Sequence, residues 1–420
     1  MSPEVPGGRV PPGGHTLVAR LDNDGDVLLA GPAIRAAAAG SERLTLLCGP
    51  RGRAAAAMLP GVDRIEVFRA HWIDPEPDPV DPAVIEDLRD RVTSLRPDRA
   101  LILTSFHQSA LPLALVLRLA GVPWIGAISD DYPGSLLDLR HRVPDDLHEV
   151  ERGRSLAAAA GFAPPPGDGG RMEVLRDPRR LPAGLPDRFV VLHPGASVSA
   201  RRWPAERFAA LAARLIRSGE QVVVTGGPGE RALTARVAAG GGTDMGGRTG
   251  LPELAEILAR AEALVSGNTG PAHLAAAVGC PVVWIAAPTV PSVRWHPWAV
   301  THREISRDVP CAGCRARECP VPGHPCMTGI GVDEVLDAIA AIRHGAGLRP
   351  DVPGRRHAPQ PRRAPMADQE QDPKTGSQQQ QEQEKWSENP QQGGPSQGAK
   401  DSDEGIGPDD ADEIVNAGEG

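Results

Sequence analysis

The chain has 420 residues, enough for two to three domains of ~150 residues each. Hydrophobic residues make up 40% and charged residues 24%, which excludes a fibrous or wholly disordered protein. The formal net charge of −9 is concentrated at the end, because residues 366–420 hold 14 acidic residues and three lysines, whereas residues 1–365 hold 42 arginines and 40 acidic residues. With a nearly neutral folded part and 13 aromatic residues in the whole chain, we expect no nucleic-acid partner.

The sequence contains no pattern typical of a secretory signal or of a membrane span. Residues 1–15 lack a charged segment followed by an apolar one, and we expect them to be flexible. The longest apolar stretch, 110–128, is interrupted by Arg118, two prolines and two glycines, which predicts a helix followed by a strand. We therefore expect a cytoplasmic protein without a transmembrane segment, either free or in peripheral contact with the inner face of the membrane. Its six cysteines are then expected to be reduced.

Strand and helix patterns alternate over residues 16–160 and again over 188–330, which predicts two lobes with parallel sheets and right-handed crossovers. In the first lobe, the expected strands are 16–21, 44–47, 65–68, 100–103 and 124–128, and the expected helices are 28–39, 82–96, 107–120 and 145–160. In the second lobe, the expected strands are 189–192, 221–225, 263–266 and 282–286, and the expected helices are 204–218, 229–239, 251–261 and 271–278. Two such lobes imply a cleft between them, a usual place for a ligand.

Composition indicates the role of the remaining segments. Residues 161–187 are rich in proline and glycine, as interdomain linkers are. A last helix is expected at 331–345, after a loop that carries four cysteines. Residues 350–420 consist mainly of Gln, Glu, Asp, Gly and Ser, and we expect a disordered tail because they can bury too little apolar surface to offset the entropy of ordering.

Three carboxylates, Asp22, Asp24 and Asp26, follow the first expected strand. Ligands of open α/β sheets bind outside the carboxyl ends of the strands, so this turn is expected to face the cleft. Repulsion among the three can raise the pKa of one of them into the range that suits a general base. The turn matches neither the glycine pattern of dinucleotide-binding proteins nor a complete calcium loop. An acidic turn that caps a helix remains the structural alternative.

Two later strand ends also carry polar loops. Residues 193–197 (HPGAS) lead to Arg201 and Arg202, two cations that suit a phosphate or carboxylate ligand. Residues 266–274 (SGNTGPAHL) open a helix whose free N–H groups and positive end favour a diphosphate. His273 in this segment either faces the ligand or packs in the core.

In this order, the motifs resemble those of bacterial glycosyltransferase family nine, whose best-known members are the ADP-heptose–lipopolysaccharide heptosyltransferases. The segments that carry the resemblance are GDVLLAGPAIRA (25–36), HPGAS with RRWPAERFAALA (193–212), VVVTGGPGE (222–230) and SGNTGPAHLAAAVGCPVVWIAAPT (266–289). The resemblance extends over about residues 16–343 and implies a GT-B fold. In that fold two Rossmann-like, doubly wound lobes flank a cleft, the acceptor lobe comes first and the nucleotide-sugar lobe second. The last helix would return to the first lobe.

The resemblance also implies an activity: inverting, metal-independent transfer of a heptose or related sugar from a nucleoside-diphosphate sugar, such as ADP-heptose, to a hydroxyl of a glycan or glycolipid, without a cofactor. Asp26 matches the proposed base of the family, and Arg201 matches a cation that is usually lysine. Asn268 stands where the family usually has Asp, which leaves the identity of the donor open. The expected site further includes Asp24 and Gly25 on the acceptor side and Ser197, Glu230, Thr249, Asn268, Thr269, Gly270, Pro271 and His273 on the donor side.

Four cysteines lie within 16 residues, a spacing that zinc sites, disulfides and free thiols all allow, although we expect no metal. They are Cys311, Cys314, Cys319 and Cys326. In the same loop, Arg315, Arg317 and His324 are candidates for contact with an anionic acceptor. Two other functions remain open: a nucleotide-sugar epimerase of the same fold, and a nucleotide-sugar-binding protein without turnover.

Overall fold

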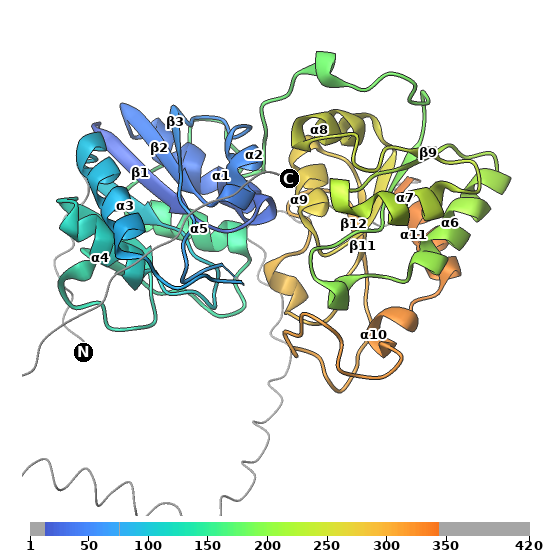
Figure 1. Ribbon diagram of the computed structural model, residues 1–420. Coiled ribbons are helices and arrows are strands. Elements are labelled where there is room, and N and C mark those ends of the chain that lie inside the picture. The colour runs from blue at the N-terminus through green and yellow to red at the C-terminus, as the bar shows by residue number, and fades with distance from the viewer. Residues whose placement is uncertain (1–12, 75, 344–420) are drawn as a thin grey trace, which may run out of the picture. The chain divides into compact units, whose positions relative to one another are not determined.

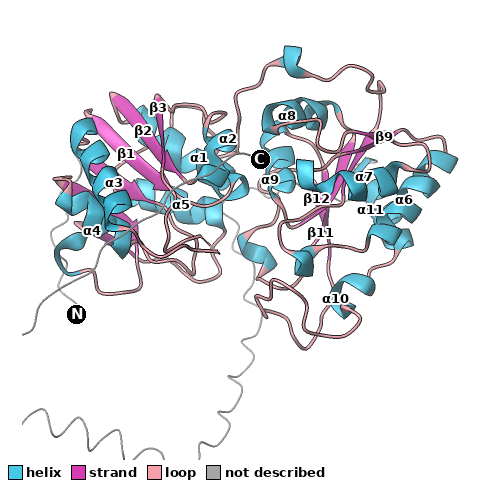
Figure 2. Ribbon diagram, in the orientation of Figure 1, coloured by secondary structure: helices cyan, strands magenta, loops and turns pink. Residues whose placement is uncertain are grey.

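The computed structural model describes residues 13–74 and 76–343, which form two lobes, each with a six-stranded parallel sheet flanked by helices (Figures 1 and 2). The first lobe contains β1 (His15–Arg20), β2 (Arg43–Cys48), β3 (Arg64–Val67), β4 (Arg99–Ile102), β5 (Trp124–Ile128) and β6 (Leu139–His141). Its helices are α1 (Asp24–Ala39), α2 (Arg53–Ala56), α3 (Pro82–Leu95), α4 (Leu111–Leu119) and α5 (Glu149–Ala159).

The second lobe repeats this plan. Its strands are β7 (Val190–His193), β8 (Val222–Val224), β9 (Thr243–Asp244), β10 (Ala263–Gly267), β11 (Val282–Ile285) and β12 (His302–Ile305). Its helices are α6 (Ala205–Arg217), α7 (Arg231–Ala238), α8 (Leu251–Arg260), α9 (Gly270–Val278), α10 (Pro325–Thr328) and α11 (Val332–Arg343).

Both sheets have the same strand order, which places a ligand site in each lobe. The orders are β3-β2-β1-β4-β5-β6 and β12-β11-β10-β7-β8-β9. In each sheet the chain therefore reverses direction of winding between its first and fourth strands, and the loops that follow these two strands diverge to leave a crevice. The crevices lie after β1 and β4 in the first lobe and after β7 and β10 in the second.

The central strands are apolar because helices cover both faces of each sheet. Every residue of β1, β4, β7 and β10 is buried, as is typical of parallel strands in the interior of an α/β sheet. The alternation of strands and helices that the sequence predicts is thus confirmed. The edge strands β6, β9 and β12 were not predicted, because they have only two to four residues and few apolar ones.

Two helix boundaries differ from the prediction in a way that matters for the site. Helix α1 begins at Asp24 instead of residue 28, so that Asp24 and Asp26 lie in its first turn, where the helix dipole favours carboxylates. Helix α4 begins at Leu111 instead of residue 107. Residues 107–110 are therefore a loop at the carboxyl end of β4.

The expectation that the last helix returns to the first lobe is wrong. Helix α11 packs against α6 and the strands β10, β11 and β12 of the second lobe. Its apolar stripe, formed by Val335, Ala338, Ile339 and Ile342, is buried in the core of that lobe. At its end, Arg343 forms ion pairs with Glu220, at 2.7 Å, and with Glu262, both in the second lobe. The helix thus completes the lobe from which it emerges.

The segment predicted as a linker, 161–187, is packed. Phe162 and Met172 are buried in a hydrophobic core cluster that includes residues of both lobes, and Asp168 forms an ion pair of 2.9 Å with the buried Arg35 of α1. Further along, Arg176 forms an ion pair of 2.8 Å with Glu256 of α8. The segment therefore contacts both lobes.

The lobes also contact each other directly. Helices α1 and α9 pack together where the lobes meet, and one hydrophobic core cluster includes residues of both helices (Figure 1). Arg294 of the second lobe stacks on Phe106 of the first, with 4.0 Å between the guanidinium carbon and the ring centroid. A cross-lobe hydrogen bond of 3.0 Å joins His148 Nε2 to the carbonyl of His296.

Within the described residues, no helix is long and apolar enough to cross a membrane. Most of the predicted flexible N-terminus and all of the predicted disordered tail, 350–420, lie outside the described residues. His15, at the end of the first of these segments, is a buried residue of β1.

Candidate active site

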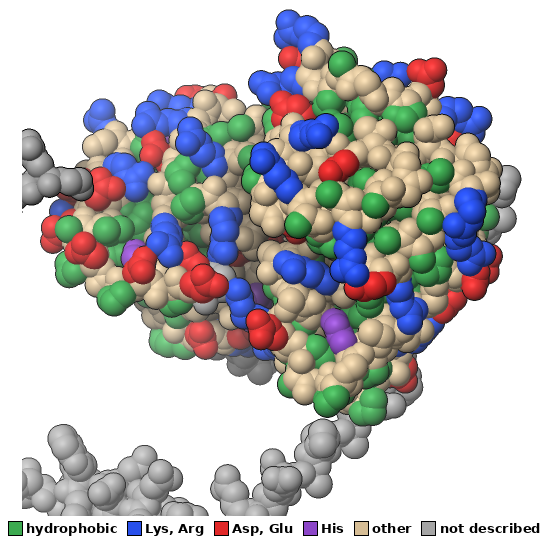
Figure 3. All heavy atoms as spheres, turned by 45° about the vertical axis from the view of Figure 1, so that its right-hand side comes forward, with side chains coloured by type: hydrophobic (Ala, Val, Ile, Leu, Met, Phe, Trp, Pro, Cys, Tyr) green, Lys and Arg blue, Asp and Glu red, His purple; other side chains and the backbone are tan. Residues whose placement is uncertain are grey.

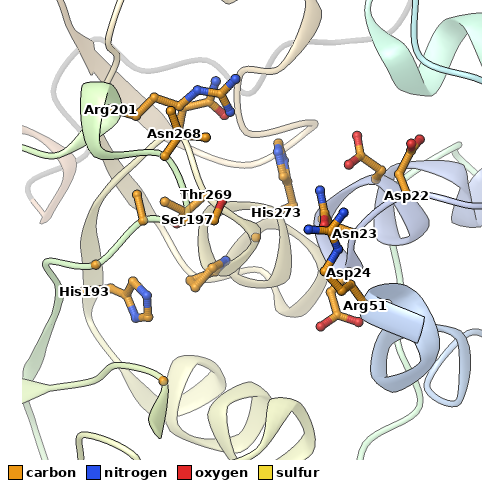
Figure 4. Close-up of a pocket in the computed structure, with 18 of the residues that line it drawn as sticks. Asp22, Asn23, Asp24, Arg51, His193, Ser197, Arg201, Asn268, Thr269 and His273 are labelled. Atoms are coloured by element: carbon orange, nitrogen blue, oxygen red, sulfur yellow. The ribbon is translucent and has the colours of Figure 1, made fainter. Parts of the chain in front are cut away.

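A cleft with a volume of about 670 Å³ lies between the lobes, at the two crevices. All twelve of the site residues predicted from the sequence line it, so the structure brings the acidic turn and the two loops of the second lobe together. In Figure 4, Asp22, Asn23, Asp24 and Arg51 approach the cleft from the first lobe, and Ser197, Arg201, Asn268 and Thr269 approach it from the second, with His273 between the two groups. The lining predicted residues are Asp24, Gly25, Asp26, Ser197, Arg201, Glu230, Thr249, Asn268, Thr269, Gly270, Pro271 and His273.

The three carboxylates of the acidic turn have different environments. Asp24 Oδ1 accepts a hydrogen bond of 2.9 Å from the backbone N–H of Ala55, and burial raises its pKa. Asp22 is buried and accepts a hydrogen bond from Gln108 Nε2. Burial raises the pKa of Asp22 and the negative charge of Asp26 adds to this effect, whereas Arg20 opposes it. The side chain of Asp26, with 21% of its surface exposed, is the most accessible of the carboxylates that contact Arg20.

Arg20, which the sequence analysis missed, connects these carboxylates. It is buried at the end of β1, and its Nη2 donates hydrogen bonds to Asp26 Oδ1 at 3.1 Å and Ser105 Oγ at 2.8 Å. Its Nε lies 2.9 Å from Asp22 Oδ2 and its Nη1 lies 3.5 Å from Glu149 Oε2. Burial alone would lower the pKa of Arg20, but the carboxylates outweigh it and raise the pKa. The sequence feature that could have indicated a role for Arg20 is its position as the one charged residue in the otherwise apolar segment TLVARL (16–21).

On the opposite side of the cleft, helix α9 points its N-terminus at the ligand space. Thr269 occupies the N-cap position, yet its side chain makes no capping hydrogen bond. Thr269 Oγ1, His273 Nδ1 and Arg201 Nε are buried atoms without a hydrogen-bond partner among the described residues. Unpaired buried polar atoms are costly, so their presence around one cleft indicates that a polar ligand completes the site.

Arg201 supplies the positive charge on this side. Burial lowers the pKa of its guanidinium, and the carboxylate of Asp26 across the cleft opposes that shift. Arginine remains charged at neutral pH even so. Asn268 is buried, and Figure 4 shows it beside Arg201. Because Asn268 is neutral, it leaves the charge of Arg201 available to a ligand.

Glu230 is held by the backbone of two loops. Its Oε2 accepts a hydrogen bond of 2.8 Å from the N–H of Gly227. A Cβ at Gly195 would lie 2.0 Å from Glu230 Oε1, so only glycine at that position lets the carboxylate lie against the loop that follows β7. His193, at the end of β7, is hydrogen-bonded to Thr225 Oγ1 at 3.0 Å, and burial lowers its pKa.

Two further histidines, His107 and His273, line the cleft. Burial lowers the pKa of His273 to about 4. Burial also lowers the pKa of His107, while the negative charge of Asp22 opposes it. The sequence predicts a helix at His107, but the residue lies in the loop after β4, which brings it to the cleft beside Gln108. Other lining residues that the sequence analysis did not assign are Arg51, Ser105, Gln108 and Trp295.

The cysteine loop is anchored to the segment that follows β11. Gly313 donates a backbone hydrogen bond of 2.7 Å to Pro288, and Arg315 one of 2.9 Å to Thr289. The described cysteines are unpaired, and the described residues contain no group of three side chains placed to hold a metal ion. Arg317 of this loop lines the cleft.

The surface outside the cleft mixes both signs of charge. On the face drawn in Figure 3, arginine side chains are interspersed with Asp and Glu. Many arginines of the described residues are in ion pairs, such as Arg69 with Asp74 at 2.7 Å. This pattern agrees with the near-neutral balance of residues 1–365.

Comparison with known proteins identifies the family. The family model described as glycosyltransferase family 9 (heptosyltransferase) matches residues 87–324, more than half of the chain. The chain belongs to this family. Its family assignment agrees with the motifs at Arg201, Glu230 and Asn268, all of which lie within the matched residues.

Curated relatives are similar over part of their length. Lipopolysaccharide heptosyltransferase 1 of Pseudomonas aeruginosa is 34% identical over 178 residues, which are 41% of this chain and 48% of that protein. Lipopolysaccharide heptosyltransferase 3 of Escherichia coli K12 is 32% identical over 121 residues, 27% of this chain and 35% of that protein. The chain thus spans about half the length, or less, of these curated relatives.

Solved structures establish the fold. The glycosyl transferase family 9 protein from Veillonella parvula has a TM-score of 0.67 at 16% identity, over 79% of this chain and 98% of that one. ADP-heptose lps heptosyltransferase II of E. coli has a TM-score of 0.62 at 20% identity, over 79% of this chain and 99% of that one. E. coli heptosyltransferase WaaC with ADP-2-deoxy-2-fluoro heptose has a TM-score of 0.59 at 19% identity, over 78% of this chain and 99% of that one. The protein therefore has the GT-B fold expected from the sequence.

Proposed function

We propose that this protein is an inverting glycosyltransferase that moves a heptose or related sugar from a nucleoside-diphosphate donor to a hydroxyl of a glycan or glycolipid. The observation that carries the proposal is the arrangement of the cleft: Asp26 lines it from the first lobe, and Arg201 and the N-terminus of α9 line it from the second. A carboxylate on one side and an anion-binding helix end on the other suit an acceptor hydroxyl and a diphosphate leaving group.

In this proposal, the donor lies on the second lobe. Its diphosphate receives hydrogen bonds from the free N–H groups of α9 near Thr269 and Gly270, and the guanidinium of Arg201 balances its charge. Ser197, Thr249, Asn268, Pro271 and His273 complete the donor side, and the carboxylate of Glu230 accepts hydrogen bonds from ribose hydroxyls. The nucleoside-diphosphate heptoses are supported as donors by WaaC, whose solved structures contain ADP and ADP-2-deoxy-2-fluoro heptose.

The acceptor lies on the first lobe, beside Asp24, Gly25 and Asp26. Asp26 takes the proton of the acceptor hydroxyl while its oxygen attacks the anomeric carbon. The bond from that carbon to the diphosphate oxygen breaks, and its electron pair stays on the diphosphate. Arg201 and the α9 amides stabilise the charge that develops there. A single displacement from the opposite side inverts the anomeric configuration. A glycolipid acceptor would bring the first lobe to a membrane surface.

One experiment separates this function from its two alternatives. Nucleotide sugars, including ADP-heptose, are screened by thermal shift, because a ligand that binds only the folded state raises the melting temperature. Those that bind are then incubated with the protein, and ADP or another nucleoside diphosphate, together with the sugar, is followed by NMR. Release of the diphosphate supports the transferase. An epimerised nucleotide sugar would instead indicate an epimerase, and binding without turnover a binding protein.

A further inference from the structure

We infer that Arg20 is a positioning residue for the transfer reaction, holding the carboxylate of Asp26 oriented toward the acceptor. The inference rests on the proposed function, in which Asp26 is the base. It assigns a role to a residue at the end of β1 whose side chain is buried beneath the cleft.

The contacts of Arg20 fix one oxygen of Asp26. Arg20 Nη2 donates to Asp26 Oδ1 at 3.1 Å and to Ser105 Oγ at 2.8 Å. Nη1 lies 3.5 Å from Glu149 Oε2, so the guanidinium is held from three sides. Among the described residues, Asp26 Oδ2 has no hydrogen-bond partner, and the Asp26 side chain is 21% exposed. One oxygen is thus anchored and the other remains available to a hydroxyl.

Electrostatics give Arg20 a second effect on Asp26. Asp22 and Glu149 are buried carboxylates whose pKa burial raises, and each repels the charge of Asp26. Arg20 is the buried cation in contact with all three. Without it, Asp26 would lose its anchor and the opposite charge that it contacts. The titratable and charged groups around this pair, from every element packed there, are Asp22, His107, Glu149, Arg152 and Arg201.

The same lobe offers a matched control. Arg35 of α1 is equally buried and forms a two-pronged pair with Asp168, with distances of 2.9 and 3.0 Å. Neither residue lines the cleft. Arg20 and Arg35 are thus both buried and ion-paired within the first lobe, whereas only Arg20 contacts Asp26.

The test is a double-mutant cycle with a pH profile, using the full chain and the best nucleotide-sugar substrate from the screen. Arg20→Met is expected to lower kcat by roughly 10–10²-fold with the donor KM little changed, since the donor lies on the other lobe. The acidic limb of the pH–kcat profile is expected to move up by about one pH unit or more, because a carboxylate loses its neighbouring cation. Arg20→Lys keeps the charge and should return the acidic limb of the pH–kcat profile to its parent position. Part of the loss in kcat should remain, because lysine lacks the planar guanidinium that binds two partners at once.

In the Asp26→Asn background, Arg20→Met should reduce kcat by less than about threefold, because residues that act as a unit are not additive. Arg35→Met should lower the melting temperature and leave kcat unchanged. Equal losses from Arg20→Met in both backgrounds, or an unmoved acidic limb, would overturn the inference. If Arg20→Met does not fold, Ser105→Ala loosens the guanidinium without removing a charge, and its loss of kcat must likewise disappear in the Asp26→Asn background. If instead the parent has no transfer activity, or Asp26→Asn matches it, the proposed function itself fails.

Discussion

Gly25 of α1 and Gly270 of α9 meet backbone to backbone across the lobe boundary. A Cβ at Gly25 would lie 3.2 Å from Gly270 Cα and 3.2 Å from His273 Cδ2. The first turns of α1 and α9 therefore approach this closely because position 25 is glycine, whereas a Cβ at Gly270 would lie at an ordinary contact distance of 3.6 Å from the Gly25 nitrogen. The contact sets the separation between Asp26, one residue after Gly25, and the helix end that faces the leaving group.

Gly25→Ala is expected to lower kcat by about tenfold while the protein stays folded. The added methyl must displace α9 by a few tenths of an ångström, and small misplacements of reacting groups have large effects on rate. Gly31→Ala, in the same helix, is the matched control, because its Cβ would lie 3.3 Å from the flexible end of Leu59. Steady-state kinetics of both variants check this, and equal activities would contradict it.

Arg201→Met is expected to reduce kcat by roughly 10²–10³-fold, the usual effect of removing one group that stabilises developing charge. Arg201→Lys should retain much of the rate because it keeps the cation. The neighbouring Arg202 does not line the cleft and instead donates to the carbonyl of Ala196 at 2.8 Å. Arg202→Met should therefore leave kcat within a few-fold of the parent. A larger effect at Arg202 than at Arg201 would reverse the assignment.

The sequence predicts most of this fold because the central strands are uninterrupted apolar runs, and it predicts the site because ligands bind where such strands end. Arg20 could not be assigned in this way, since two of its partners, Ser105 and Glu149, are 85 and 129 residues away. The sequence also does not predict which lobe α11 packs against. Its apolar stripe shows that it is amphipathic, but the surface that covers this stripe, on α6 and the strands β10, β11 and β12, is set by tertiary packing that the sequence does not reveal.

His273 predicts how stability depends on pH. Its folded-state pKa of about 4 lies below the usual histidine value of 6.5, so the protein takes up a proton on unfolding at pH values between these two. The free energy of unfolding is then lost as pH falls from about 6.5 to about 4, by up to about 3 kcal/mol from this group. Urea unfolding of the parent and of His273→Gln at several pH values in this window isolates the effect. The parent should lose more stability on acidification, and parallel curves would contradict the prediction.

A chelator is expected to leave turnover intact. The helix end and Arg201 already supply the donors and charge that a diphosphate needs. The acidic turn is engaged with protein groups, since Asp22 binds Gln108 and Asp24 binds the Ala55 amide. Rates are compared with and without EDTA, and then after addition of magnesium. Loss in EDTA with recovery in magnesium would identify residues 22–26 as a metal site.

Asp26→Asn and Asp24→Asn form the most direct test of the base, because the two carboxylates are two residues apart and have different partners. Asp24 is bound to the Ala55 amide at 2.9 Å, whereas Asp26 has an oxygen free of protein hydrogen bonds among the described residues. Asp26→Asn keeps the shape but cannot accept the proton, so kcat should fall by roughly 10²–10⁴-fold. The donor KM should change little, since Asp26 is on the lobe opposite the donor.

Asp24→Asn can still accept the Ala55 hydrogen bond through its amide oxygen, so kcat should stay within a few-fold of the parent and the loss should appear in the melting temperature. Full kinetics of both variants against donor and acceptor make the comparison. An inactive Asp24→Asn with an active Asp26→Asn would move the base by two residues. If both variants stay active, the acidic turn serves to start α1, and the proton is taken by another group in the cleft, with His107 the next to be substituted.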